Sequence, residues 1–528
     1  MKTDVQEFLE EVTQRVRPLE KAYNLAYWDA AVTGKEEDNQ RQAETNGAWM
    51  RFWADPDLYA RARGLEAHDG RDPLTARQIR IASLYSGRYQ QDEAAIAAIT
   101  RLEAEARHEF YHHRARLDGR TLSDNEVDDL LKQTRDSDEA RTVWEASKEI
   151  GTRVADRIRT MAHLRNASAQ AEGYRDHFQR WLELNEIPES TLLDLFDRLE
   201  RSTLAPYQAL KQDIDRARAA RFRIPIEGLR PWHYGDRFFQ DPPADLGEVD
   251  RDALFAGQDP RELSRITYEG LGMDVRPILE RSDLFERAGK NQHAFCIDID
   301  REGDIRTLDN LRQDYNWNET LLHELGHGVY WQHIDPALPW LVRDISHILA
   351  TEAVALLMGS QVNDPRWLTE IAGAAPDEAA RLTEAARQRT RATRLIFTRW
   401  CLVVTNFERA LYADPGGDLD TVYWDLVERF QEIRRPEGRR APDWAAKIHI
   451  ATDPVYYQNY ELGYLITAQL EDRLRRQFGG LVGHPEAGRW LIDHFFRPGA
   501  TLDWMALVES ATGEALNPDY FVRELAGA

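Results

Sequence analysis

The sequence predicts a mainly helical protein that carries one small β-ribbon. Apolar residues recur at helical spacing through most of the chain, first between Phe8 and Leu19. Proline-containing breaks such as Asp55-Pro56-Asp57 separate these segments. Residues 293–308 are the best candidate for a strand that turns and pairs back. Although 528 residues would allow two or three domains, we expect a single folded unit.

The other elements follow from periodicity and from the breaks. In the N-terminal half, helices are expected over residues 4–35, 38–68, 74–118 and 137–182, with a second break at residues 70–73. Another helix should begin at Ser123, which has the sequence pattern of a helix N-cap. Prolines interspersed with glycines predict an irregular connection between two lobes at residues 222–262. Beyond the ribbon, helices are expected over residues 345–361, 377–412, 420–434 and 456–477.

The acidic composition excludes some classes of partner. The formal net charge is −23, and the sequence lacks the basic patch that a nucleic-acid partner requires. A negative field of this strength favours cationic ligands, although acidity serves mainly solubility. The two cysteines, Cys296 and Cys401, are too few for a disulfide framework. A single bridge between them is the alternative, and we expect two reduced, buried thiols.

The sequence also indicates the cellular compartment in which the protein is expected. Residues 1–8 lack the apolar core of a signal peptide. No run of about 18 apolar residues occurs anywhere, so no membrane-spanning segment is predicted. We therefore expect a soluble, cytoplasmic protein with no membrane partner, and the sequence does not decide its oligomeric state.

A histidine pair inside an apolar helix is the strongest functional signal. His323-Glu324-Leu325-Gly326-His327 is flanked by further leucines and a valine. Histidines four residues apart share one helix face and can bind one divalent metal, for which zinc is well suited. Glu324 lies beside them, where it can take a proton from the water that the metal binds. The alternative is a pair of ordinary surface histidines, which the apolar flanks and the cost of burying unpartnered imidazoles disfavour.

A catalytic zinc site usually has three protein ligands, and the third should come from another helix. Residues 345–359 form a strongly apolar helix in which Glu352 is the only carboxylate, 25 residues after His327. A bare buried glutamate is costly, and metal ligation removes that cost. His347 is the competing candidate, which could instead partner a ligand or be a core histidine.

Two other segments have possible roles around such a metal. In the ribbon, His293–Asp300 is the predicted strand, Arg301-Glu302-Gly303 the turn and Asp304–Leu308 the returning strand. Peptidases often hold an extended peptide by main-chain pairing with a strand of this kind, and a purely structural hairpin is the alternative. In residues 447–464, Tyr457 and Tyr460 are three apart and can share one helix face, where hydroxyls could stabilise an oxyanion. A tyrosine-rich core helix is the alternative there.

Four further segments allow a choice among the related families that share this metal motif. Arg135–Ala146 contains an Arg-Asp-x-Asp-Glu…Trp-Glu pattern, and Leu164–Asp176 contains Leu-x-Asn-x-x-Ala-x-x-x-x-Tyr-x-Asp. Both patterns, together with Phe8–Glu11 and Tyr27–Asp29, resemble the angiotensin-converting-enzyme family (M2) of zinc dipeptidyl carboxypeptidases. The resemblance is to a distant bacterial-type member, and it extends from the first helix to about residue 470.

The resemblance implies a mainly helical gluzincin fold, in which two lobes surround a deep central channel and a small β-ribbon lies beside the metal helix. Residues 1–221 would form the N-terminal lid and the first lobe. Residues 222–262 would form the irregular connection, and residues 263–528 the zinc-bearing catalytic half. A covered channel would exclude folded proteins and admit short flexible peptides.

The resemblance also implies roles for individual side chains. His323, His327 and Glu352 would bind Zn2+, and Glu324 would act as general base and later as proton donor. The residues implied in oxyanion stabilisation are His449 and Tyr460. The residues implied in substrate binding are Lys447 and Tyr457 for the C-terminal carboxylate, and His293 and Ala294 for the peptide backbone. A lysine is a good point-charge partner for that carboxylate, whose position would set the cut one dipeptide from the end.

Three positions depart from the family pattern. Leu356 replaces an aspartate that orients a zinc histidine, so the residues supporting the ligands must differ. Asn459 replaces an arginine that holds an activating chloride, which argues against chloride activation by that route. The interval from His449 to Tyr460 is one residue longer than in the family, which leaves the choice of tyrosine open.

These observations predict a zinc metallopeptidase that removes dipeptides from the C-terminus of oligopeptides. A related zinc endo-oligopeptidase, or a carboxypeptidase that releases single residues, is the main alternative. An inactive peptide-binding protein is a more distant one, because such relatives usually lose a member of the set that this chain retains.

Overall fold

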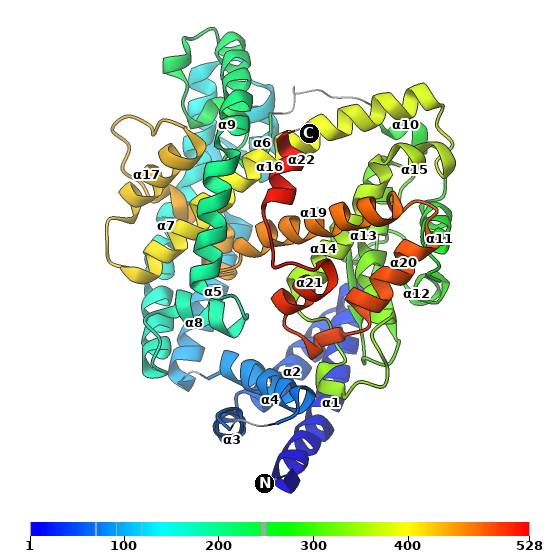
Figure 1. Ribbon diagram of the computed structural model, residues 1–528. Coiled ribbons are helices and arrows are strands. Elements are labelled where there is room, and N and C mark those ends of the chain that lie inside the picture. Colours follow the sequence, from blue (N-terminus) through cyan, green and yellow to red (C-terminus); the bar gives the residue numbers. More distant parts are fainter. Residues whose placement is uncertain (1, 69–70, 91, 118, 244–249, 527–528) are drawn as a thin grey trace.

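The computed structural model describes residues 2–68, 71–90, 92–117, 119–243 and 250–526, and it is mainly helical (Figure 1). The first half contains α1 (Lys2–Thr33), α2 (Glu36–Trp53), α3 (Pro56–Glu66), α4 (Pro73–Arg88), α5 (Glu93–His112), β1 (Ala115–Leu117), β2 (Arg120–Leu122), α6 (Asp124–Gln133), α7 (Ser137–Ala171), α8 (His177–Leu184) and α9 (Glu189–Phe222). The middle contains η1 (Ile226–Gly228), η2 (Pro231–Tyr234), α10 (Asp252–Phe255), α11 (Pro260–Gly270), α12 (Arg276–Arg281), β3 (Phe295–Asp298), β4 (Ile305–Leu308), α13 (Tyr315–Gln332), η3 (Trp340–Val342), α14 (Ile348–Gly359), η4 (Ser360–Asn363) and α15 (Pro365–Glu370). The last part contains α16 (Pro376–Ala413), α17 (Leu419–Gln431), η5 (Asp443–Ala446), α18 (Ile448–Thr452), α19 (Gln458–Phe478), α20 (Pro485–Leu491), η6 (Ile492–Phe496), η7 (Gly499–Thr501), α21 (Trp504–Thr512) and α22 (Asp519–Ala526).

The helices form two sides and one end of the molecule. In Figure 1, α7, α9 and α17 lie on one side, α11, α12, α13 and α20 lie on the other, and the long helices α16 and α19 run between the two sides. One apolar core extends through both sides, from Ile99 to Leu525. Helices α1–α4 lie together at one end and share a second core, which also includes Trp340 and Leu341. The division into lobes and lid stays a prediction, and residues 244–249 of the predicted connection lie outside the described residues.

Most of the predicted helices and the ribbon are confirmed. Ser123 begins α6 with a reciprocal capping box, in which Glu126 accepts from the backbone of Ser123. The break at Asp55 is also confirmed, because its side chain caps the start of α3. Strands β3 and β4 are antiparallel, with Phe295 opposite Leu308 and Asp298 opposite Ile305. The predicted break at residues 70–73 is followed by α4, although Gly70 itself lies outside the described residues.

Two predictions of continuous helix are wrong. The helix predicted over residues 74–118 is divided, because Asp92 caps a new helix with its side chain and the chain then enters the β1–β2 hairpin. The tight turn of that hairpin uses Gly119 at a φ of +79°, a conformation in which glycine is favoured. The helix predicted over residues 137–182 is divided between α7 and α8, where Asp176 caps the second helix.

Two expectations from composition are tested as well. Cys296 and Cys401 are both free thiols, as predicted. Within the described ranges, we find no helix that combines the length and the apolar character needed to cross a membrane.

A close approach of α13 and α14 determines the geometry of the motif helix. A Cβ atom built at Gly326 would lie 2.8 Å from the Cα atom of Ala355, so these helices meet backbone to backbone. Helix α14 packs on its other side against α19, where Thr467 donates a hydrogen bond to the carbonyl of Ala353. The predicted zinc motif and the predicted glutamate ligand therefore lie on two helices that touch inside the core.

We predict that Gly326→Ala lowers the free energy of unfolding by about 1–3 kcal/mol, because the added methyl group must separate α13 from α14. Gly64→Ala is the matched control, since Gly64 lies on exposed α3 with no atom near its built Cβ. That change should be stabilising by about 0.5–1 kcal/mol through helix propensity. Urea unfolding of both variants measures this, and equal midpoints would contradict the close approach.

Candidate metal centre and catalytic site

Three side chains from α13 and α14 form a candidate metal site. His323 and His327 lie one turn apart on α13, and their Nε2 atoms lie 3.7 and 3.5 Å from the two carboxylate oxygens of Glu352. One ligand atom from each residue can be chosen so that all three lie within 4.8 Å of one another. The prediction that these residues converge is therefore supported by geometry, with two helices supplying the donors.

The chemistry of this donor set fits zinc. Burial lowers the pKa of His323 to about 4 and that of His327 to about 3, so both imidazoles are neutral and have a lone pair to donate. Burial raises the pKa of Glu352 to about 7, because its charge is poorly solvated. A divalent cation would restore that lost solvation, and two imidazoles with one carboxylate are a known ligand set for catalytic zinc.

Glu324 is held beside this group. It is only 7% exposed, and the backbone N–H of Cys296 on β3 donates a hydrogen bond to its carboxylate. Burial raises its pKa well above the ordinary value, and the negative charges of Asp309 and Glu352 raise it further. This environment gives the carboxyl group of Glu324 a raised proton affinity, which suits a group that takes and returns a proton.

The tyrosine segment faces the same region. The rings of Tyr457 and Tyr460 lie 5.5 Å apart, and that of His449 lies 5.2 Å from Tyr457. Burial raises the pKa of Tyr460, with a contribution from the charge of Glu352, so the hydroxyl is neutral and able to donate. The charge of Glu352 also raises the pKa of Tyr456, which keeps the choice of tyrosine open.

Lys447 lies in a pocket of aromatic rings. Its Nζ atom is 5.3 Å from the ring centre of Phe238, 5.6 Å from Tyr457 and 5.9 Å from Trp400. It donates a 2.7 Å hydrogen bond to the side-chain oxygen of Gln240. Loss of solvation lowers the pKa of this lysine to about 8.

The predicted backbone-binding residues lie at the start of the ribbon. The paired part of β3 begins at Phe295, so His293 and Ala294 precede the ladder, whereas the predicted strand began at His293. The backbone N–H of His293 donates to Asn291, which bends the chain there. The ribbon packs against α13, because the Sγ atom of Cys296 would lie 3.5 Å from a Cβ atom built at Gly328.

Comparison with known proteins finds two similarities to this chain. A family model described as angiotensin-converting enzyme (peptidase M2) matches residues 1–212. The angiotensin-converting enzyme of Theromyzon tessulatum is 20% identical over 427 residues, which cover 74% of this chain and 68% of that protein. The chain is a distant homologue of the angiotensin-converting-enzyme family. The family model covers the N-terminal helices and ends before the candidate metal site.

One contact of this distant M2 homologue was missed by the sequence analysis. Gln240 comes from the irregular connection, more than two hundred residues from Lys447, and no local pattern marks it. The available signal was the length of residues 222–262, which is unusual for a loop without a packed or functional role.

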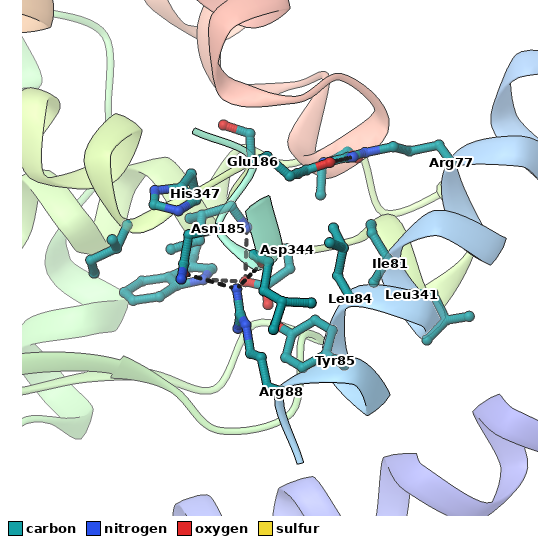
Figure 2. A pocket seen from close by; sticks show the side chains of 16 residues that line it. Arg77, Ile81, Leu84, Tyr85, Arg88, Asn185, Glu186, Leu341, Asp344 and His347 are labelled. Carbon is teal, nitrogen blue, oxygen red and sulfur yellow. Dashed lines mark hydrogen bonds and ion pairs between the residues drawn. The ribbon is translucent and has the colours of Figure 1, made fainter. Parts of the chain in front are cut away.

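The competing ligand, His347, is not part of the metal group in this M2 homologue. It caps α14, where its Nδ1 atom accepts from the backbone of Leu349 at 3.1 Å, and its ring also meets the backbone of Asn185. Figure 2 shows it on the wall of a separate cavity of about 290 Å³, next to Asn185 and across from the pair formed by Arg77 and Glu186. The predicted preference for Glu352 over His347 is therefore supported by the geometry.

We predict that Glu352→Gln weakens zinc binding by at least about 100-fold, because loss of a ligand should exceed the 10–100-fold effect of losing a supporting residue. His347→Asn should leave zinc binding unchanged, since asparagine also caps a helix. Metal content after dialysis against a weak chelator measures both. Equal loss in the two variants would contradict the assignment of Glu352.

Proposed function

We propose that this protein is a zinc peptidase that releases dipeptides from the C-terminus of short oligopeptides. The observation that supports it most is the convergence of His323, His327 and Glu352, with the buried carboxyl group of Glu324 beside them, in a distant M2 homologue. The angiotensin-converting-enzyme family supplies the class of reaction. The cutting rule rests on the pocket around Lys447.

In this proposal His323, His327 and Glu352 hold the metal. Zinc bound there would act as a Lewis acid that polarises the scissile carbonyl group and activates water. Glu324 takes the proton of the attacking water on a carboxylate oxygen and returns it to the leaving amine. The hydrogen bond from the backbone of Cys296 keeps that carboxyl group oriented, and burial keeps its proton affinity high.

Tyr460 and His449 are the proposed donors to the oxyanion. The tyrosine hydroxyl keeps its proton because burial raises its pKa, so it can donate without ionising. A fixed donor of this kind contributes about 10²–10³-fold to turnover in comparable hydrolases. Tyr456, whose pKa is also raised by burial and by the charge of Glu352, is the other candidate for this role.

Lys447, Gln240 and Tyr457 are proposed to bind the substrate's terminal carboxylate. The hydrogen-bond partner of Lys447 is an amide oxygen, so its charge is not neutralised by a carboxylate in direct contact. The amide nitrogen of Gln240 remains able to donate to an incoming carboxylate, as does the hydroxyl of Tyr457. Capture of that group would place the cut at a fixed distance from the end of the peptide.

The edge of β3 completes the proposed site. Strand β4 pairs with β3 on one side, and an extended peptide could add to the other side near His293 and Ala294. In this proposal α1–α4 roof a deep channel between two lobes. Short, unstructured peptides would enter it and folded proteins would not.

We predict stepwise loss of dipeptides from the C-terminus of a blocked decapeptide with a free carboxylate, followed by mass spectrometry in the presence of zinc. Glu324→Gln should retain zinc and lose about 10²–10⁴-fold in turnover, because the proton acceptor is gone. The variant also serves as a control for contaminating peptidases.

The other possible results of this experiment distinguish the alternative functions. Internal cuts or release of single residues would support an endo-oligopeptidase or a carboxypeptidase with the same zinc chemistry. An intact peptide in the presence of zinc-loaded protein would favour an inactive peptide-binding protein. Loss of zinc from Glu324→Gln would contradict the role of that residue as a base.

We predict that Lys447→Met raises KM about 10–100-fold for free-acid peptides and much less for the matching C-terminal amides, as expected for loss of a charged hydrogen bond. In the wild type, KM for the free acid should rise as the pH passes about 8, because the lysine then loses its proton. The amide substrate provides the pH control. Equal changes in KM for both substrates would contradict the carboxylate-binding role of Lys447.

A further inference from the structure

The metal-binding face of α13 has a supporting contact that comes from α14. The Nδ1 atom of His327 lies 2.8 Å from the hydroxyl oxygen of Thr351. Thr351 is fully buried, and it immediately precedes Glu352. Two consecutive residues of α14 thus contact opposite ring nitrogens of one histidine, since the Nε2 atom of His327 lies 3.5 Å from Glu352.

A metal bound at Nε2 would determine where the imidazole proton of His327 lies. A neutral histidine has one N–H and one lone pair, and a metal takes the lone pair. If Nε2 faces the metal, the proton must lie on Nδ1, where it is donated to the oxygen of Thr351. We propose that Thr351 is the positioning residue of this metal site, which selects the tautomer of His327 and fixes the orientation of its ring.

In the part of the chain that the structure describes, no other side chain forms a hydrogen bond with the Nδ1 atom of His327. Leu356, at the position where the family resemblance implies an aspartate, is apolar and lies against α19, 3.9 Å from a Cβ atom built at Gly463. Among the described residues, no hydrogen-bond partner contacts the second ring nitrogen of His323. In this chain the hydroxyl of Thr351 therefore contacts a ring nitrogen of His327, in the role that the family pattern gives to a carboxylate.

Support of His327 by a threonine hydroxyl instead of a carboxylate has a chemical consequence. A carboxylate that accepts from a metal-bound histidine raises the basicity of that ligand, whereas a neutral hydroxyl orients the ring with little added charge. The metal site should therefore depend on the geometry that Thr351 provides more than on its electrostatics. This inference rests on the proposed metal site, and it concerns how that site is supported rather than which peptide is cut.

The test compares Thr351→Val with Thr351→Ser in the full chain. Valine keeps the branched shape and removes the hydroxyl, whereas serine keeps the hydroxyl and removes the methyl group. Zinc affinity is measured by competition with a chelator in the absence of peptide, together with the rate of zinc release. We expect about 10–100-fold weaker binding for valine and less than about 3-fold for serine.

The outcomes separate this inference from the proposed function. Unchanged zinc affinity in Thr351→Val, with a wild type that binds zinc, would overturn the role of Thr351 and leave the metal site intact. Equal losses of zinc affinity in both variants would show that Thr351 acts through packing, and would also overturn its proposed role as the positioning residue. A wild type that binds no zinc would overturn both proposals.

A second measurement does not depend on the folding of the two Thr351 variants. Nitrogen-15 labelling of the histidines in the zinc-loaded wild type reports which ring nitrogen carries the proton. We expect His327 to be protonated at Nδ1, assigned by loss of its signal in His327→Gln. A proton-free Nδ1 atom would overturn the proposal.

Discussion

The close contact between α13 and α14 is the constraint on which the site depends. Gly326 allows the two backbones to meet, because any side chain there would collide with Ala355. Only at this separation can Glu352 reach both motif histidines while Thr351 reaches the outer nitrogen of His327. The glycine within the histidine motif is therefore as necessary to the candidate metal site as the three side chains that could bind the metal.

Burial gives this pair of helices an electrostatic character that favours a cation. Glu324 is buried and the partly buried Glu352 lies beside it, while Asp309 adds a third acidic group whose pKa burial raises to about 7. Three poorly solvated carboxyl groups repel one another when ionised, which is unfavourable for the folded state. A divalent cation among them offsets both the repulsion and the lost solvation. The same acidic groups that lower the stability of the folded protein would thus raise its affinity for a divalent cation.

The sequence predicts features that arise from nearby residues better than contacts between elements that are far apart in the chain. The histidine pair and the isolated carboxylate of Glu352 follow from helical periodicity, and the capping box at Ser123 follows from a four-residue pattern. Gln240 and Thr351 could not be predicted, because each acts through a partner on another element. The β1–β2 hairpin was missed although a glycine marked its turn, because the surrounding residues also fit a helical pattern.

The pocket around Lys447 is built on different supports from the metal site. Its rings come from α16, from the segment before α19 and from the irregular connection, where Phe238 and Gln240 lie two residues apart. An irregular backbone can present both an aromatic ring and an amide to one lysine, which a regular helix face at that spacing would direct apart. The ammonium group loses solvation there and its pKa falls to about 8. A ligand carboxylate restores the lost interaction, whereas a neutral amide cannot. Under the proposed function, the cost of burying the lysine would become selectivity for peptides with a free C-terminus.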